Sequence, residues 1–141
     1  MEVPHAYLRL DGHSRSTTLY LPQRDLKQER SEGPQLNSSD PETAVRVTGV
    51  DYVKSLEELG SDLFTANCIY IPMAPAEGRE ACRDTLLHAM HLRDTDPWDR
   101  RPSTEKLFHE KLAAICCNAT FLDLSPILDQ LRLIKSPTKL R

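Results

Sequence analysis

The stretch YLRLDGHSRSTTLYL, residues 7–21, decides how the fold begins. It contains two runs of strand-forming residues, 7–10 and 17–21, and the polar segment between them opens with Asp11 and Gly12. Tyrosine and threonine favour strands, and an Asp-Gly pair favours a tight turn. The pattern therefore predicts a β-hairpin.

Serine caps predict three helices beyond the hairpin. In two of them a glutamate follows the serine by three residues, a capping box in which each side chain bonds to a free amide of the first turn. The first helix should end at Gly49, and Gly60 should stop or bend the second. The capping pairs are Ser39 with Glu42 and Ser55 with Glu58, and the third cap is Ser103.

Apolar spacing predicts the remaining elements. Strands are expected at 68–71 and 121–124, and charged loops at 24–34 and 94–102. Strands that alternate with helices predict an α/β layered sandwich. Three helices should face inward through Cys82, Leu86, Ala89 and Met90 (residues 80–92), through Phe108, Leu112, Ile115 and Cys116 (103–117), and through Ile127, Leu128, Leu131 and Ile134 (from Ser125).

Composition sets the broad class of the protein. The chain has 141 residues, enough for about one domain, and its net charge of −3 argues against a nucleic-acid-binding surface. The longest apolar runs, such as 68–71, fall far short of the roughly 18 residues that span a membrane. No charged-then-apolar leader opens the sequence, so we expect neither secretion nor membrane insertion.

The four cysteines are expected to be reduced. Cys116 and Cys117 are adjacent in an apolar helical pattern, where free cysteine behaves as a small buried hydrophobe. No second pair at zinc spacing accompanies them. A nucleophilic pair of Cys82 with His109 stays open, although core packing is favoured. Reduced thiols favour a cytoplasmic protein.

The order and spacing of several segments resemble the amino-terminal domain of Xaa-Pro aminopeptidases, of the creatinase/prolidase or pita-bread superfamily. The end of the chain is similar to the linker helix that joins this domain to the catalytic domain. The segments are TTLYLPQRD (17–25), ERSEGP (29–34), VTGVD (47–51), SLEELG (55–60), CIYIP (68–72) and LDQLRLIKSPTKLR (128–141).

The resemblance implies a three-layer α/β/α sandwich with a mixed sheet, of the ribonuclease-H-like kind, without a metal of its own. The catalytic domain that follows in this family holds two divalent ions, often manganese, through two Asp, one His and two Glu. These ions activate a water for cleavage of an Xaa-Pro bond. We therefore expect no catalytic or metal-binding residue in this chain.

The resemblance also sets the expected boundaries. Residues 1–135 form the domain, and 136–141, where Ser136 and Pro137 read as a helix start, begin the linker to an absent catalytic domain. In this family a helix and a strand precede the segment that matches Tyr7, but only six residues precede it here. The domain should thus lack its first strand and helix, and a partner strand could fill the gap.

The expected role is that of a non-catalytic domain that builds homo-oligomer contacts and limits access to the active site. Its partners would be its own catalytic domain and further copies, and proline-containing peptides would be substrates of the parent enzyme. Two alternatives stay open. One is a free-standing interaction module with the same fold, and the other is a domain of a prolidase or creatinase relative.

Four residues are candidates for this role. His13 and Arg15 lie in the hairpin loop, and Arg15 could meet a substrate carboxylate, although a solvated turn is favoured. Trp98 could anchor a subunit contact or fold back on its own domain. Leu133 lies off the apolar stripe of the last helix, which indicates a second surface that the catalytic domain would cover.

One helical face carries a metal-like set of side chains. Asp84, His88 and His91 share this face, but they span about two turns, too long for one small ion. We expect a solvated surface there.

Overall fold

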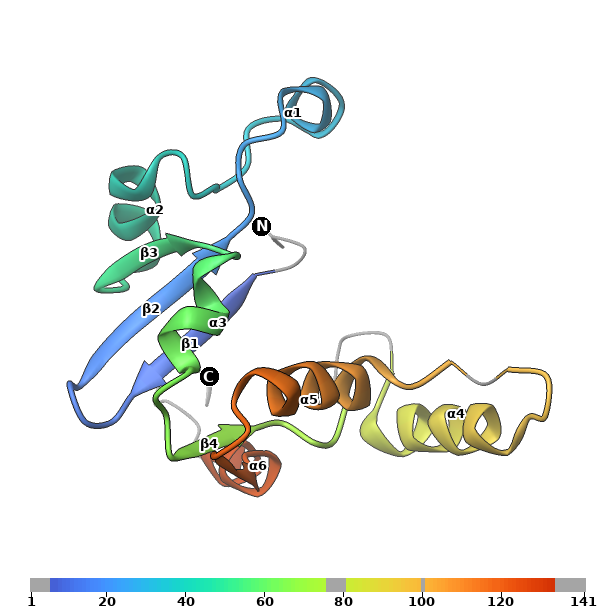
Figure 1. The fold of residues 1–141 in the computed structure, drawn as a ribbon. Coiled ribbons are helices and arrows are strands. Elements are labelled where there is room, and N and C mark those ends of the chain that lie inside the picture. The colour runs from blue at the N-terminus through green and yellow to red at the C-terminus, as the bar shows by residue number, and fades with distance from the viewer. Residues whose placement is uncertain (1–5, 76–80, 100, 134–141) are drawn as a thin grey trace. The chain divides into compact units, whose positions relative to one another are not determined.

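The computed structural model describes residues 6–75, 81–99 and 101–133 (Figure 1). The chain divides into two compact units, Met1–Phe64 and Thr65–Arg141. No helix within the described residues combines the length and apolarity needed to cross a bilayer. The predicted linker start at 136–141 lies outside the described residues.

The first unit is built on a mixed three-stranded sheet in the order β1-β2-β3. Strands β1 (Tyr7–Asp11) and β2 (Ser16–Leu21) are antiparallel and form the predicted hairpin. Strand β3 (Tyr52–Ser55) pairs with β2 in parallel, with Val53 opposite Leu19. The sequence pattern missed β3, because this four-residue strand is defined by its pairing with a distant segment and not by a local signal.

Three helices accompany this sheet: α1 (Leu26–Glu32), α2 (Pro41–Thr48) and α3 (Glu58–Leu63). The prediction of a loop at 24–34 is wrong. Asp25 caps α1 by accepting hydrogen bonds from the amides of Lys27 (2.8 Å) and Gln28 (3.3 Å). Figure 1 shows that α1 stands away from the sheet of its own unit.

The predicted capping boxes are shifted. The cap of α2 is Asp40 rather than Ser39, with Pro41 at the first helical turn, while Gly49 ends the helix at φ 76° as predicted. Ser55 ends β3, and its amide donates to the Glu58 carboxylate (3.1 Å), so half of the second box forms. Gly60 lies inside α3 and does not stop it.

The core of the first unit lies where sheet and helices meet. Tyr20, Leu21 and Ala44 are fully buried, and Leu63 of α3 is buried as well. Helix α3 lies across one face of the sheet (Figure 1). Helix α3 therefore covers the centre of this face of the sheet.

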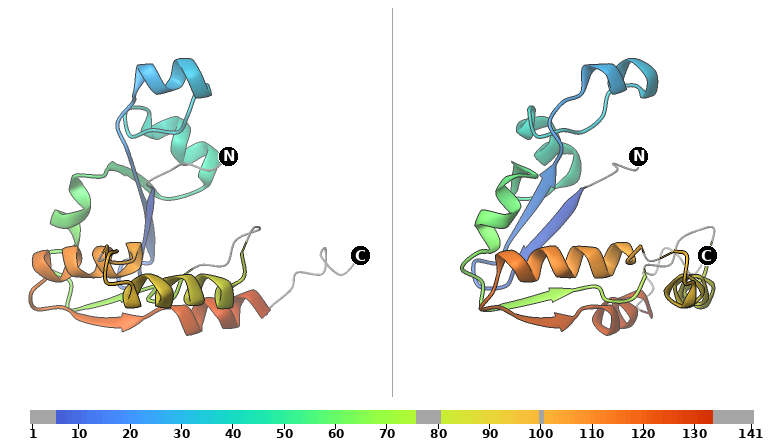
Figure 2. Two further views of the ribbon diagram at one scale, coloured as in Figure 1. Left: turned by 90° about the vertical axis from the view of Figure 1, so that its right-hand side faces the viewer. Right: turned by 45° about the vertical axis from the view of Figure 1, so that its right-hand side comes forward.

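The second unit contains a parallel pair of strands, β4 (Cys68–Ile71) and β5 (Thr120–Asp123), which confirms both predicted strands. Helix α5 (Thr104–Ile115) runs along this pair (Figure 2), and Ser103 caps it as predicted. The ring of His109 meets that of Phe121 edge-on, with 5.0 Å between centroids. The buried apolar residues are Ile69, Ile71, Leu112 and Cys116.

The helices of this unit depart from the predicted burial to different degrees. In α4 (Arg83–Thr95) no residue is buried: Leu86 and Met90 are half-buried, and Cys82 and Ala89 are exposed. Helical spacing shows which residues share a face, but it does not show that another element covers this face. Figure 1 shows α4 extending away from the β4–β5 pair.

The prediction that α5 and α6 (Ser125–Leu133) bury an apolar stripe is confirmed only in part. In α5, Phe108 is half-buried and Ile115 is exposed. In α6, Leu128 is half-buried, whereas Ile127 and Leu131 are exposed, and Ile134 lies outside the described residues.

All four cysteines are free. Only Cys116 is buried, and burial raises the pKa of its thiol. The expectation that Cys117 is buried is wrong: it follows the last turn of α5 and faces solvent, and its thiol donates to the carbonyl of Ala114 (3.4 Å).

The predicted fold class is confirmed. In the part of the chain that the structure describes, six helices and two small sheets, one of them mixed, make an α/β protein. The α/β order that the sequence indicates therefore holds in both units.

Candidate functional site

The hairpin loop places the two gating candidates on the surface of the first unit. His13 and Arg15 are both exposed. Asp11 shapes the loop, since its carboxylate accepts hydrogen bonds from the amides of Ser14 (3.2 Å) and His13 (2.9 Å). These bonds lower the pKa of Asp11. The Asp11 carboxylate thus holds the loop, while the side chains of His13 and Arg15 are exposed to solvent.

Arg15 has a left-handed backbone conformation, with φ of 52°. Such a conformation is uncommon for residues with a side chain and fits the tight return of the hairpin. The structure thus places a guanidinium at the tip of a defined turn. Its role as a contact to substrate stays a prediction.

A network of polar side chains connects the sheet of the first unit to α3. The buried Tyr20 hydroxyl donates to Asp62 (2.7 Å), and the Lys54 ammonium donates to the same carboxylate oxygen (2.7 Å). The bond from Lys54 holds the pKa of Asp62 low. Burial, together with the bond to Asp62, raises the pKa of Tyr20 to about 12. The protonated phenol donates to Asp62, so the network joins β2 and β3 to α3.

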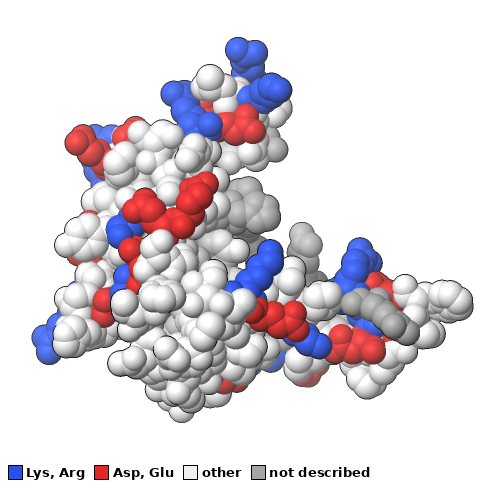
Figure 3. Space-filling view, viewed as in Figure 1, with Lys and Arg blue, Asp and Glu red and all other residues white. Residues whose placement is uncertain are grey.

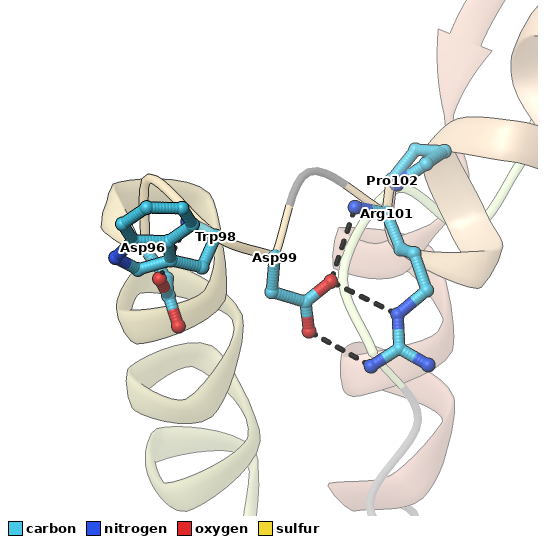
Figure 4. A pocket seen from close by; sticks show the side chains of 5 residues that line it. All are labelled: Asp96, Trp98, Asp99, Arg101 and Pro102. Atoms are coloured by element: carbon cyan, nitrogen blue, oxygen red, sulfur yellow. Dashed lines mark hydrogen bonds and ion pairs between the residues drawn. The ribbon is translucent and has the colours of Figure 1, made fainter.

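Trp98 lies in the loop between α4 and α5 of the second unit. Its side chain is 94% exposed, so the described residues do not show it folding back. Figure 4 shows the shallow pocket formed by Asp96, Trp98, Asp99, Arg101 and Pro102. Asp96 accepts a hydrogen bond from the Trp98 amide (2.8 Å). Sequence analysis gave the indole's place in a loop, but only the structure gives its exposure.

A paired carboxylate and guanidinium fix the far side of this loop. Arg101 donates through Nε and Nη2 to the two oxygens of Asp99 (2.9 and 2.8 Å; Figure 4). These bonds lower the pKa of Asp99 well below its usual range. The pocket therefore places the exposed indole beside the Asp99–Arg101 ion pair and the Asp96 carboxylate.

Leu133 closes α6 with an exposed side chain (81%). The sequence analysis expects a second apolar surface of this helix at Leu133. What covers that surface stays a prediction.

The side chains considered for chemistry are dispersed. Cys82 contacts Thr85 (3.3 Å), which lowers the pKa of its thiol, while His109 contacts the ring of Phe121. Asp84, His88 and His91 do not form a metal-binding group. Throughout residues 6–75, 81–99 and 101–133, no three His, Cys, Asp or Glu side chains are arranged to hold a metal ion.

Charges of both signs are mixed on the surface that Figure 3 shows. Figure 3 shows Lys and Arg side chains interspersed with Asp and Glu on the face in view. This distribution agrees with the net charge of −3.

Of three comparisons with known proteins, only the comparison with solved structures finds matches. No family model matches the sequence, and no curated protein matches it. Solved structures of aminopeptidase P do match. The E. coli enzyme in complex with substrate is similar at 21% identity and a TM-score of 0.55, over 99% of this chain and 29% of that one. Proline aminopeptidase P II from Yersinia pestis is similar at 23% identity and a TM-score of 0.53.

The matches cover nearly all of this chain but only a small part of each aminopeptidase P chain. The match with the low-pH form of the E. coli enzyme takes in 97% of this chain but only 28% of that chain, at a TM-score of 0.52. The chain therefore spans under a third of the proteins that it resembles. It has the fold of the amino-terminal domain of aminopeptidase P.

Proposed function

We propose that this chain is the non-catalytic amino-terminal domain of an Xaa-Pro aminopeptidase-like dinuclear metallopeptidase. The observation that carries the proposal is the match to 97% of this chain and 28% of an aminopeptidase P chain. The parent enzyme would release an amino-terminal residue that precedes proline. A prolidase or creatinase relative would use the same domain, because substrate choice lies in the catalytic part.

The described residues do not fit the metal centre of such an enzyme. They hold no cluster of three His, Cys, Asp or Glu. A zinc-substituted form of the E. coli aminopeptidase P is among the similar structures. In the parent of this chain, the two ions, which we take to be manganese, would be bound by a catalytic domain beyond Arg141. No step of the reaction is assigned to this chain.

The domain would serve oligomerisation and active-site access. Its exposed features support this role: Trp98 stands out from the loop between α4 and α5, the hairpin tip carries His13 and Arg15, and Leu133 is exposed at the end of α6. In the parent, Leu133 would meet the catalytic domain and residues 136–141 would enter the linker helix. Four free thiols support a cytoplasmic setting.

The length of the natural protein tests the proposal. An antibody raised against this chain should detect, in native extracts, a species much larger than 16.0 kDa. Mass spectrometry of this species should yield downstream peptides with the set of two Asp, one His and two Glu. A natural product of 16.0 kDa would contradict the proposal and favour the free-standing interaction module.

A further inference from the structure

We propose that Asp11 is a site of spontaneous isomerisation to isoaspartate, in which the main-chain nitrogen of Gly12 attacks the Asp11 side chain. The hydrogen bonds that the folded hairpin makes to the Asp11 carboxylate slow this reaction. The modification goes beyond the proposed function and does not depend on it. It involves only the β1–β2 hairpin, and the structure describes every residue from Tyr7 to Leu21.

The reaction closes a ring and opens it again. The Gly12 nitrogen forms a bond to Cγ of the protonated Asp11 carboxyl group, and the amide hydrogen leaves with the carboxyl hydroxyl as one water. The product is a five-membered succinimide. Water then adds to one of its two carbonyl carbons. Opening at Cγ restores aspartate, whereas opening at the main-chain carbonyl leaves the chain linked through Cγ, as isoaspartate. Water is released and taken up again, so no oxidant, reductant or further reactant is needed.

Gly12 leaves the attacking nitrogen accessible. Asp11 is the only aspartate or asparagine in the sequence that a glycine follows. Because glycine has no β-carbon, its backbone can reach conformations that ring closure requires. Gly12 is exposed, and a β-carbon placed on it would meet no atom within 4 Å in the described part of the chain. The hairpin loop therefore leaves room for the rearrangement at this position.

The folded hairpin holds both oxygens of the Asp11 carboxylate. Oδ1 accepts hydrogen bonds from the amides of His13 (2.9 Å) and Ser14 (3.2 Å). Oδ2 accepts one from the Arg9 guanidinium (2.8 Å). The bonds from Ser14 and His13 lower the pKa of Asp11, because they favour its charged form. Ring closure uses the protonated carboxyl group and competes with all three bonds, so the fold slows the reaction without preventing it.

Isoaspartate would alter the tip of the hairpin. It adds one carbon to the main chain between residues 11 and 12 and leaves the original main-chain carboxyl group as the side group. Asp11 ends β1 opposite Ser16, so the longer main chain disturbs the pairing at this point. The loop that carries His13 and Arg15 also loses the acceptor that holds it. The modification would thus reshape the segment in which both gating candidates lie.

Incubation of the purified 141-residue chain at neutral pH for several weeks tests the proposal. Trypsin, which cleaves after Arg9 and Arg15, then releases the peptide LDGHSR, residues 10–15. The isoaspartate form of this peptide has the same mass, elutes separately and accepts a methyl group from a protein-isoaspartate methyltransferase. Its fraction should rise with time. In guanidinium chloride, which removes the bonds to Asp11, it should rise about tenfold faster or more.

Variants of the folded chain separate the parts of the mechanism. Gly12→Ala should lower the rate severalfold, since alanine lacks the conformational freedom of glycine. Arg9→Gln removes the ion pair on Asp11 Oδ2 and should raise the rate about two- to fivefold. The tryptic peptide of this variant spans residues 1–15 and is scored in the same way. Arg24→Gln is the matched control, because it removes the 2.8 Å pair with Glu29, outside the hairpin, and should leave the rate unchanged.

Three results would overturn the proposal. They are no isoaspartate at residue 11 in either the folded or the unfolded chain, an equal rate in both, and a rate that Arg9→Gln or Gly12→Ala leaves unchanged. The comparison of the folded with the unfolded wild-type chain needs no variant, so it decides even if a substitution prevents folding. None of these results bears on whether the natural gene product is a longer enzyme, so this proposal and the proposed function can fail separately.

Discussion

The first unit and helix α4 of the second unit are held in different ways. In the first unit, side-chain bonds join residues far apart in sequence: Thr17 donates to Asp51 through its amide (2.7 Å) and hydroxyl (2.8 Å), and Tyr20 reaches Asp62. Helix α4 has thirteen residues and none of them is buried. Its tie to α6 is a pair of hydrogen bonds from Arg83 to Asp129 (2.5 and 2.8 Å).

The difference teaches where rigidity comes from in this protein. A buried core resists local opening, whereas a helix with few buried contacts opens at little cost. The sheet of the first unit should behave as the stable frame. Helix α4 and the Trp98 loop that follows it should open more readily.

The largest effect is expected in the core of the first unit. Leu21→Ala removes a fully buried side chain and should lower the free energy of unfolding by about 2–5 kcal/mol. Leu87→Ala, at a position 42% exposed in α4, should cost less than about 1 kcal/mol. Urea denaturation followed by far-ultraviolet circular dichroism gives both values. Equal losses would remove the distinction between the two regions.

The Tyr20 hydroxyl should give the next largest effect. Tyr20→Phe removes the side-chain hydrogen bond from Tyr20 to Asp62, keeps that from Lys54, and should cost about 1–3 kcal/mol, because the lost hydrogen bond is to a carboxylate. Tyr52→Phe is the control, since Tyr52 is exposed on β3 and its change should stay within about 0.5 kcal/mol.

The same residue predicts an alkaline limit. The folded pKa of Tyr20 is about 12, against about 10 for an unfolded tyrosine. The raised pKa contributes stability in full below pH 10, and that contribution is lost as the pH rises toward 12. The decline in unfolding free energy over this window should be shallower for Tyr20→Phe. Parallel declines would show that Tyr20 does not titrate in this way.

A smaller effect is expected where α4 is tied to α6. Asp129→Asn weakens the paired contact with Arg83 and should cost about 1 kcal/mol or less, as partly exposed ion pairs do. Amide exchange in α4 should become faster while exchange in β2 stays the same. Faster exchange in both would mean that the regions open together.

The smallest effect concerns Trp98, the only tryptophan. Its fluorescence should be quenched by acrylamide as fully as that of free indole, because its side chain is 94% exposed. Unfolding of the first unit should change this emission little. Strong protection from the quencher in the monomer would show that the indole is covered by its own chain.

Local signals were enough for much of the fold. The hairpin, the end of α2 at Gly49, the cap of α5 at Ser103 and both strands of the second unit follow from short patterns. Helix α1 escaped prediction because its residues are mostly polar and only the Asp25 cap marks it. Strand β3 is defined by its pairing with β2, in which Thr18 lies opposite Tyr52. A short stretch of sequence around β3 therefore carries no signal for this strand.

The sequence predicted where the candidate residues lie along the chain, but not which of them other elements cover. The sequence placed Arg15 in a turn and Trp98 in a loop, and both lie there. It could not show that Trp98 is uncovered, that α4 has no buried face, or that Cys117 turns outward. These properties depend on which elements meet in three dimensions, and apolar spacing along one helix carries no such information.

The central claim is that this chain is a folded domain without peptidase activity of its own. A peptidase assay tests this claim most directly. The purified chain, at its natural sequence, is incubated with manganese and a short peptide whose second residue is proline. The account predicts no release of the amino-terminal residue above the rate with manganese alone. Metal-dependent release that a chelator abolishes would contradict it.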